Sequence, residues 1–352
     1  MVATDDAPLV CVTGATGFLA SCLVADLLVR GYQVRGTVRD RAKADRLAAL
    51  PGAAERLTTV EAELRAPATL QAAVEGCATV FHTASPYVIN VADPQRDLVD
   101  PAVQGTVNTL AACAAAGGIR RVVLTSSMAA VTDEPESDHV LTETDWNTKS
   151  TLERNPYYLS KTLAERAAWD FMAAEKPSFD LVAINPFVVM GPSLSPALNV
   201  SNQILVDLLS GAYPAILNLT WGIVDVRDVA LAHVRAAEVP EASGRYLCAA
   251  PPVTMRQVVT WVRESGYGHG RRLPTRGLDH WLGDQIVRLE SYRRPAGTGS
   301  YLRTHIGRTP RYETAKVQRE LGLRFRPTRE TILDTLADLA GWGHLGPKDG
   351  MH

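Results

Sequence analysis

The first half of the chain alternates short apolar runs, rich in β-forming residues, with Ala- and Leu-rich stretches of helical periodicity. The apolar runs are continuous, as expected for strands that are covered on both faces. Strict alternation of strand and helix favours right-handed crossovers, so the predicted fold class is α/β with a doubly wound parallel sheet. The predicted strands are Leu9–Thr13, Gln33–Val38, Leu57–Ala62, Thr79–Ala84, Arg121–Thr125 and Asp180–Asn185, and the predicted helices are Phe18–Arg30, Arg41–Leu50, Ala66–Glu75, Asp97–Ala116 and Tyr157–Glu175.

Composition argues against several classes of protein. The 352 residues include 36 Lys and Arg against 38 Asp and Glu, a net charge of -2, so no nucleic-acid partner is expected. No apolar run is long enough to cross a bilayer, so no membrane partner is expected either. Met1 to Pro8 lacks the apolar core of a secretory signal. Five cysteines, an odd number without a C-x-x-C pattern, favour free thiols in a reducing cytoplasm over disulfides or a metal site.

A glycine turn follows the first predicted strand directly and opens the first predicted helix. Gly14 permits the tight turn, Gly17 lets the backbone approach a pyrophosphate, and Ala20 lets the helix pack close to the strand. The helix N-terminus offers free N–H groups to phosphates. This context predicts a Rossmann-type dinucleotide site, against the alternative of a glycine turn without a ligand. The expected cofactor contacts in this segment are Gly14, Thr16, Gly17, Phe18 and Leu19.

The end of the second predicted strand indicates which dinucleotide binds. A NAD site usually carries an acidic residue there, which holds the ribose hydroxyls. Here the position is Val38, followed by Arg39. Arg39 suits a 2′-phosphate, and Lys43, one helical turn further, adds a second charge. Asp40 is expected to cap the following helix. The predicted cofactor is NADP, with surface solubility as the alternative role of Arg39 and Lys43.

A serine pair and a later Tyr-x-x-x-Lys motif make up the candidate catalytic set. Ser126 and Ser127 end the fifth predicted strand, at the sheet edge where α/β proteins bind ligands. Tyr157 and Lys161 lie four residues apart, on one face of the predicted helix. The lysine ammonium favours the tyrosinate and lowers the tyrosine pKa, so the phenol can give a proton to a carbonyl oxygen near neutral pH. The serine hydroxyl would hold the same oxygen.

In combination these motifs resemble the extended short-chain dehydrogenase/reductases. The likeness is to the dihydroflavonol-reductase-like branch, which includes cinnamoyl-CoA reductases, and is nearest to its methylglyoxal, aldehyde and carbonyl reductases. The resemblance spans nearly the whole chain. The matching segments are Thr13–Phe18, Gly36–Asp40, Val80–Pro86, Thr125–Ser127, Tyr157–Glu165, Asn185–Pro186, Val224–Ala230 and Lys316–Leu323.

The resemblance implies an NADP-dependent oxidoreductase of the alcohol dehydrogenase or ketoreductase type. Hydride from NADPH would reduce an aldehyde or ketone while Tyr157 protonates the oxygen, with Ser127 as the triad serine and Lys161 as the partner of Tyr157. Tyr157 and Lys161 would also contact the cofactor. The further cofactor contacts are Arg39, Lys43, Glu63, Leu64, Thr83, Ala84, Ser85, Thr125, Ser126, Pro186, Val188 and Val189, with Glu63 in place of the aspartate expected at the adenine.

Departures from the family pattern narrow the substrate. Thr132 stands where the flavonoid enzymes have an asparagine that recognises the flavonoid ring, and Arg154–Lys161 departs from the cinnamoyl-CoA reductase signature. Asn199–Gln203 resembles the methylglyoxal and aldehyde reductases. Two alternatives stay open, a NAD-dependent sugar-nucleotide epimerase or dehydratase and a non-catalytic NADP-binding sensor on the same fold. The protein is expected to act as a monomer or a homodimer.

Other residues receive structural interpretations. Thr132-Asp133-Glu134 is explained by a polar turn before Pro135, and His82 by a buried histidine with its polar atoms satisfied. Trp221 is equally consistent with lining a substrate pocket and with capping the smaller lobe.

The pattern changes after about residue 190, where proline and glycine interrupt shorter pieces. We expect residues 1–190 to form the dinucleotide-binding domain, with some later segments returning to it, and residues 191–352 mainly to form a substrate-binding lobe. Predicted helices of this part are Thr254–Ser265, Tyr312–Leu321 and Thr328–Leu339. Arg271–Arg311 carries nine arginines against Asp279, Asp284 and Glu290. A solvated face explains this excess, and an anionic-substrate or partner site is the alternative.

Overall fold

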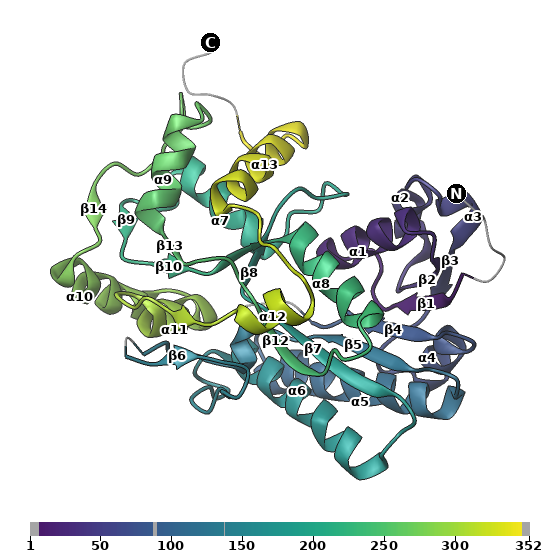
Figure 1. Ribbon diagram of the computed structural model, residues 1–352. Helices are drawn as coiled ribbons and strands as arrows, with labels where there is room; N and C mark the ends of the chain where they lie inside the picture. Colours follow the sequence, from purple (N-terminus) through teal and green to yellow (C-terminus); the bar gives the residue numbers. More distant parts are fainter. Residues whose placement is uncertain (1–6, 87–89, 137, 347–352) are drawn as a thin grey trace.

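A parallel sheet of seven strands forms the centre of the protein (Figure 1). The structure is a computed structural model and describes residues 7–86, 90–136 and 138–346. The strand order is β12-β7-β5-β4-β1-β2-β3, and every neighbouring pair is parallel. The strands are β1 (Leu9–Val12), β2 (Gln33–Val38), β3 (Leu57–Glu61), β4 (Thr79–His82), β5 (Arg121–Thr125), β7 (Asp180–Pro186) and β12 (Gly244–Cys248).

Helices cover both faces of this sheet. On one face α1 (Phe18–Val29) packs against α8 (Val226–Glu238), and on the other lie α4 (Pro67–Val74), α5 (Asp100–Ala116) and α6 (Pro156–Glu175). Successive residues of β1 alternate between these layers. Val10 and Val12 join the core that contains α1 and α8, whereas Cys11 joins the core of the other face. The predicted doubly wound α/β sheet is confirmed, and its apolar runs are continuous because both faces are covered.

The order of the strands indicates where a ligand is expected. From β1 the chain moves outward through β2 and β3, and then returns to the other side of β1 to add β4 and β5. The carboxyl ends of β1 and β4 therefore lie at the point where the direction of winding reverses. Open α/β sheets bind their ligands at this switch point.

Several elements differ from the sequence prediction. The strand β12 was not predicted, and it extends the sheet beyond β7. The helix expected over Arg41–Leu50 is a 3-10 turn, Arg41–Lys43, followed by the short α2 (Asp45–Ala48) and α3 (Ala53–Arg56), because Pro51 disfavours helix in the residue before it. The helix expected from Tyr312 begins only at Ala315, because Arg311–Tyr312 pairs as β15 with β6 (Val140–Leu141).

A smaller lobe stands beside the carboxyl edge of the sheet and has its own apolar core. Its helices α7 (Val200–Ser210), α9 (Met255–Glu264) and α13 (Thr328–Gly341) supply much of that core. Thr254 and Gln257 form a capping box that begins α9. The remaining elements of the later half are β8 (Val188–Met190), β9 (Ile216–Leu217), β10 (Thr220–Trp221), β11 (Ile223–Asp225), β13 (Val253–Thr254), β14 (Gly277–Leu278), α10 (Trp281–Glu290), α11 (Ala296–His305) and α12 (Ala315–Glu320).

None of the helices in the described part of the chain combines the length and the apolar character needed to cross a membrane. The five cysteines are free thiols. Within the same described ranges, no cluster of His, Cys, Asp and Glu has a metal-binding arrangement.

Candidate active site

The glycine turn between β1 and α1 fits tightly against the end of β4. Gly14 has φ 65°, and a Cβ there would lie 3.0 Å from the Ala84 Cβ. The Thr13 hydroxyl oxygen accepts hydrogen bonds from the Thr83 and Ala84 N–H groups, each at 3.1 Å. A residue with a side chain at position 14 would therefore be strained and would also push this loop away. The turn holds Ala84 and Ser85 beside the switch point of the sheet.

The N-terminus of α1 is open to a ligand. Gly17 is the N-cap residue and offers no side chain to the first free N–H groups, and the first turn contains no acidic residue. The half-buried Thr16, Phe18 and Leu19 flank this end. Uncapped N–H groups and the positive end of the helix dipole are what a pyrophosphate requires.

Arg39 lies just beyond β2 with its side chain exposed. It makes no hydrogen bond or ion pair with the described residues, so its guanidinium is available to a phosphate. The Asp40 carboxylate accepts a hydrogen bond from the Ala42 N–H at 3.0 Å, which confirms its predicted capping role. The side chain of Lys43 lies outside the described part of the structure.

Glu63 and Leu64 differ in their environments. Glu63 is exposed after β3, and its N–H donates to the Thr69 hydroxyl at 3.1 Å. Leu64 packs against α5, where a Cβ on Gly105 would lie 2.9 Å from it. Asn108 also donates a hydrogen bond to the Leu64 carbonyl oxygen at 2.9 Å. Leu64 therefore has a packing role whatever else it contacts.

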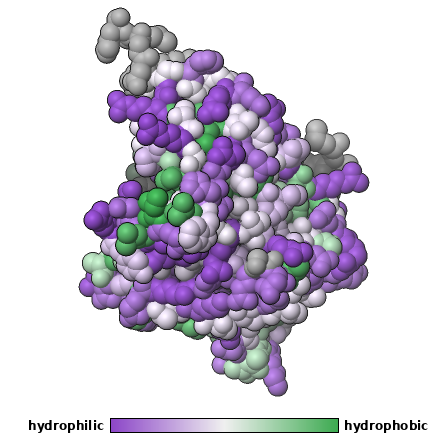
Figure 2. Space-filling view, turned by 90° about the vertical axis from the view of Figure 1, so that its left-hand side faces the viewer, coloured by the Kyte–Doolittle hydropathy of each residue, from purple (hydrophilic) through white to green (hydrophobic). Residues whose placement is uncertain are grey.

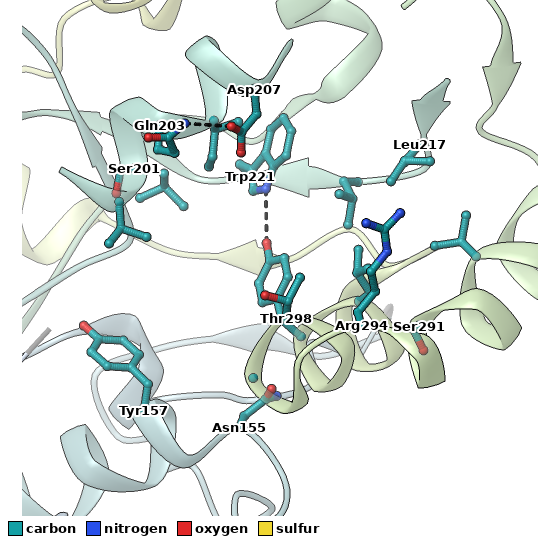
Figure 3. A pocket seen from close by; sticks show the side chains of 18 of the residues that line it. Asn155, Tyr157, Ser201, Gln203, Asp207, Leu217, Trp221, Ser291, Arg294 and Thr298 are labelled. Carbon is teal, nitrogen blue, oxygen red and sulfur yellow. Dashed lines mark hydrogen bonds between the residues drawn. The ribbon is translucent and has the colours of Figure 1, made fainter. Parts of the chain in front are cut away.

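Ser127 and Tyr157 line one cavity of about 630 Å³ between the sheet and the smaller lobe. Figure 3 shows the cavity with Tyr157 at one side of it. Ser127 follows β5, and its Oγ accepts a hydrogen bond from the Ala129 N–H at 3.1 Å. That bond leaves the serine proton free to donate elsewhere. Tyr157 lies in the first turn of α6 and meets the Tyr158 ring edge to face, at 6.1 Å between centroids. The predicted serine and tyrosine thus face the same space.

Lys161 lies one turn further along α6 and is buried. It lines a water-sized void together with Ala84, Ser85, Thr125 and Ser126. Burial lowers the pKa of Lys161 to about 8, and the charge of Glu165 opposes part of that shift. The structure therefore brings Lys161 close to the residues expected at the cofactor, on the helix that carries Tyr157.

His82 has the structural role expected of it. It ends β4 with 2% of its surface exposed, and its Nδ1 lies 3.0 Å from the Thr13 hydroxyl. Burial, with a further contribution from the charge of Lys161, lowers the pKa of His82 to about 3. A neutral histidine is held here.

Glu165 organises a buried polar network beneath the site, which the sequence analysis did not identify. Its carboxylate pairs with Arg245 at 2.6 Å and accepts hydrogen bonds from the Ser126 hydroxyl at 2.5 Å and the Asn185 amide at 2.8 Å. The Asn185 amide also donates to the Ser127 carbonyl oxygen at 3.2 Å. The network therefore fixes the end of β5 relative to α6 and β12. The spacing Lys161-x-x-x-Glu165 was the available signal, because it places both residues on one helix face.

A second cluster fixes the start of α6. Asn155, the N-cap residue, has φ 50° and is buried. Its N–H donates to the Ser300 hydroxyl at 3.1 Å, and its side-chain amide donates to Asp133 and to the Thr304 hydroxyl. Asp133 also pairs with Arg154 at 2.8 Å. The start of the helix that carries Tyr157 is therefore tied to α11 of the smaller lobe.

Asp133 and Glu134 do lie in a turn, but they contribute more than the predicted polar turn. Asp133 is 1% exposed, and Glu134 pairs with Arg154 at 2.6 Å and with Arg308. Arg308 belongs to the basic segment Arg271–Arg311, so one of its nine arginines serves this contact between the two parts of the protein.

The cavity is lined mainly by apolar side chains. Trp221 is 2% exposed, lines the cavity, and donates a hydrogen bond to the Tyr301 hydroxyl at 3.1 Å. Trp221 thus both lines the pocket and packs in the core of the smaller lobe. Thr132 and Val188 also line it, whereas Pro186 is buried at the end of β7 and Val189 packs on the sheet core. Gln203, Asp207 and Arg294 are among the polar residues that line the cavity.

Comparison with known proteins identifies the family. Residues 10–249 match the NAD dependent epimerase/dehydratase family. The chain belongs to this family. Two relatives from Medicago truncatula are similar to it, "Cinnamoyl-CoA reductase CAD2", 44% identical over 72% of this chain and 80% of the relative, and "Cinnamoyl-CoA reductase 2", 39% identical over 96% and 92%. Yeast methylglyoxal/isovaleraldehyde reductase Gre2 complexed with NADPH superposes with a TM-score of 0.78 at 29% identity, over 96% of this chain and 99% of Gre2.

Within the NAD dependent epimerase/dehydratase family, these relatives confirm the predicted resemblance to extended short-chain dehydrogenase/reductases of the dihydroflavonol-reductase-like branch. Vestitone reductase from alfalfa adds a further structural likeness, with a TM-score of 0.73 at 26% identity over 96% of this chain and all of that one.

Proposed function

We propose that the protein is an NADPH-dependent carbonyl reductase that converts an aldehyde or ketone to an alcohol. One observation carries this proposal. Ser127 and Tyr157 face one mainly apolar cavity, and Lys161 lies a helical turn from Tyr157, beside residues expected at the cofactor. A hydroxyl pair of this kind can hold and protonate a carbonyl oxygen, while the apolar walls keep water from the reacting carbon.

The chain's own residues fit NADPH. Gly14 and Ala84 form a cradle that a Cβ would fill, and the open N-terminus of α1 suits the pyrophosphate. Arg39 is an exposed cation without a protein partner among the described residues, and it would hold the 2′-phosphate. Relatives support the same cofactor, because Gre2 from yeast and from Candida albicans was solved with NADPH. When bound, NADPH supplies the hydride.

The protein supplies the proton and orients the carbonyl group. The Ser127 and Tyr157 hydroxyls would both hydrogen-bond the carbonyl oxygen, and the Tyr157 proton moves to that oxygen as the carbon gains hydride. The positive charge of Lys161 stabilises the tyrosinate that remains. The products are an alcohol and NADP⁺, and a proton from solvent restores the Tyr157 phenol.

Replacing Arg39 with alanine tests the cofactor assignment. We expect the Kd for NADPH to rise roughly 10- to 100-fold, because hydrogen bonds to a charged group are lost, while the Kd for NADH changes little. Titrations of NADPH and NADH fluorescence measure both constants. Arg41→Ala is the matched control, since Arg41 is exposed two residues away. Equal losses for NADPH and NADH, or an equal effect of Arg41→Ala, would contradict the assignment.

The pH profile tests Lys161. Because burial lowers the pKa of Lys161 to about 8, its ammonium is present below that pH and is lost as pH rises through it. We expect kcat/KM for NADPH, which reports the free enzyme, to fall above pH of about 8. In Lys161→Arg this basic limb should disappear, even if the maximal rate is lower, because guanidinium stays charged. If the basic limb persists unchanged in Lys161→Arg, it does not arise from Lys161, and the role assigned to this residue is contradicted.

A direct comparison of simple carbonyl compounds with CoA thioesters is needed to identify the substrate class. The identity to cinnamoyl-CoA reductases favours a second candidate, reduction of an aromatic CoA thioester to an aldehyde with release of the CoA thiol. The departure of Arg154–Lys161 from the signature of those enzymes favours simple carbonyls. Consumption of NADPH and NADH should therefore be measured over aldehydes, α-dicarbonyls, β-ketoesters, aryl ketones and cinnamoyl-CoA thioesters.

Turnover of free carbonyls with NADPH supports the proposal, and turnover confined to thioesters replaces it with the second candidate. Purified protein that carries stoichiometric NAD would favour an epimerase or dehydratase instead. NADPH binding without turnover of any compound would favour the sensor function.

A further inference from the structure

Helix α10 presents a wide apolar face to solvent. The helix lies at the outer edge of the smaller lobe (Figure 1), and an apolar patch is visible on that side of the molecule (Figure 2). Soluble proteins rarely expose large contiguous apolar patches without a binding purpose. The exposed large apolar residues of α10 and the turn after it, called here the α10 face, are Trp281 (70% exposed), Leu282 (59%), Ile286 (51%), Leu289 (72%) and Tyr292 (74%), and the exposed polar Gln285 lies among them.

The spacing puts these side chains on one side of the helix. At 3.6 residues per turn, positions 281, 282, 286 and 289 fall within one arc, and 292 continues it in the 3-10 turn Ser291–Arg293. The opposite side of α10 carries Gly283, Asp284 and Val287, which are buried against the lobe. The helix therefore meets its own protein with a narrow buried side and turns its main apolar stripe outward, the reverse of an ordinary surface helix.

The segment that contains the α10 face carries an excess of positive charge. The segment Arg271–Arg311 holds nine arginines and three carboxylates in a chain whose net charge is -2. Each of the three carboxylates has a partner within the protein. Asp279 pairs with Arg256, Glu290 pairs with Arg293 at 2.9 Å, and the buried Asp284 accepts a hydrogen bond from Asn218 at 3.1 Å.

The arginines beside the face remain in excess of these carboxylates. Arg276 and Arg294 are exposed, and their guanidinium groups make no ion pair or hydrogen bond with the described residues. Arg303 lies over the ring of Tyr292, 4.6 Å from its centroid. Cationic side chains beside an apolar stripe are complementary to an anionic surface with an apolar interior.

We propose that α10 docks the protein onto an anionic lipid surface, with the α10 face inserted among the acyl chains and the arginines at the headgroups. Trp281 and Tyr292 stand at the two ends of the stripe, and both residue types favour the membrane interface. A helix that lies in the interface needs no membrane span, so the lack of a spanning helix among the described residues is compatible with it. The proposal revises the expectation that no membrane is involved.

A second copy of the chain is the weaker alternative. Pairing two copies through this helix would bring the Arg276 and Arg294 guanidinium groups of both copies to one interface, where like charges repel each other. A convex helix also requires a complementary groove in a protein partner, whereas lipid chains adapt to its shape. Anionic lipid supplies both the apolar contact and the opposite charge.

The docked helix would also place the cavity next to the lipid. Ile286 and Arg294 line the cavity and are also exposed, and Val287 lines it from the buried side of the helix. Helix α10 is thus a wall between the cavity and the proposed lipid surface. This position follows from the structure whichever carbonyl compound the site reduces.

Vesicle flotation with the full chain tests the proposal. Vesicles of equimolar phosphatidylglycerol and phosphatidylcholine are compared with vesicles of phosphatidylcholine alone, at low and high salt. We expect co-flotation with the anionic vesicles, weakened by salt. The double substitution Trp281→Gln and Leu289→Gln should weaken binding roughly tenfold or more, because two inserted apolar side chains are lost. Neither residue lines the cavity, so reductase activity should not change.

Val29→Gln is the matched control, because Val29 is an equally exposed apolar residue (75%) on α1, away from the basic segment. Its flotation should equal that of the unmodified chain. The proposal is overturned if the unmodified chain does not float with anionic vesicles, or if Val29→Gln and the double variant lose binding equally. It is also overturned if light scattering shows a dimer that the double substitution dissociates while vesicles are not bound, since the face would then serve a second copy.

Discussion

Tyr157→Phe is expected to lower kcat for carbonyl reduction by about 10²- to 10⁴-fold, the range typical of a lost general acid. The change removes a single oxygen, so the cavity keeps its shape and the Kd for NADPH should stay within about twofold of its original value. Single-turnover kinetics with NADPH and fluorescence titration measure the two quantities separately.

Tyr158→Phe provides the control for this experiment. Tyr158 neighbours Tyr157 and lines the same cavity, but its hydroxyl lies 3.3 Å from Nε2 of His305. We expect Tyr158→Phe to retain most of the activity. Turnover by Tyr157→Phe at the level of the unmodified enzyme, or equal losses in both variants, would remove Tyr157 from the role of proton donor.

Arg245→Met is expected to lower the free energy of unfolding by roughly 3–5 kcal/mol, because it leaves the Glu165 carboxylate buried without its cation. Both side chains are almost completely buried, at 6% and 0% exposed. Adding Glu165→Gln should recover part of the loss, since a neutral amide oxygen still accepts from Ser126 and Asn185 and no unpaired charge remains. Urea denaturation followed by circular dichroism measures these changes.

An exposed ion pair gives the matched control for the buried one. Arg319 pairs with Glu320 at 2.9 Å, and the Arg319 side chain is 68% exposed. Arg319→Met should change the free energy of unfolding by less than about 1 kcal/mol. If Arg245→Met is no more destabilising than Arg319→Met, the network beneath the active site does not hold it together as described.

Short-range sequence patterns predicted six of the seven strands of the central sheet. The continuous apolar runs, such as Arg121–Thr125, identified the six predicted strands because both faces of the sheet are covered. The strand β12 escaped notice because Gly244–Cys248 is short and begins with Arg245, a charged residue in an otherwise apolar stretch. Arg245 is tolerated there only because Glu165, 80 positions earlier, neutralises it, and such a pairing cannot be read from one strand.

The candidate site likewise combines local motifs, which the sequence shows, with long-range contacts, which it does not show. The glycine turn, the serine pair and the Tyr-x-x-x-Lys motif are local patterns, and the structure brings Ser127, Tyr157 and Lys161 to neighbouring spaces at the predicted edge of the sheet. The contacts that position them are long-range. Asn155 meets Thr304 across 149 positions and Arg308 meets Glu134 across 174, and no periodicity or motif predicts such pairs.

Helical periodicity also could not predict that the α10 face points toward solvent. Apolar residues at helical spacing predict a face that packs against something, and they do not say whether that partner is the protein's own core. The sequence showed only the excess of arginines in Arg271–Arg311, for which a partner site was one of two explanations. The exposure of Trp281 and Leu289 in the structure shows that this face does not pack against the protein's own core.

Transfer of deuterium from labelled NADPH tests the central claim most directly. The enzyme is given NADPH with deuterium at the hydride-donating carbon and a carbonyl compound that it turns over, and the product is analysed by mass spectrometry and NMR. The proposed mechanism predicts one deuterium on the new carbinol carbon for each NADPH oxidised, and none with Tyr157→Phe on the same timescale. A product that carries no deuterium, or NADPH that is not consumed while the substrate is isomerised or dehydrated, would contradict carbonyl reduction and restore the epimerase or dehydratase alternative.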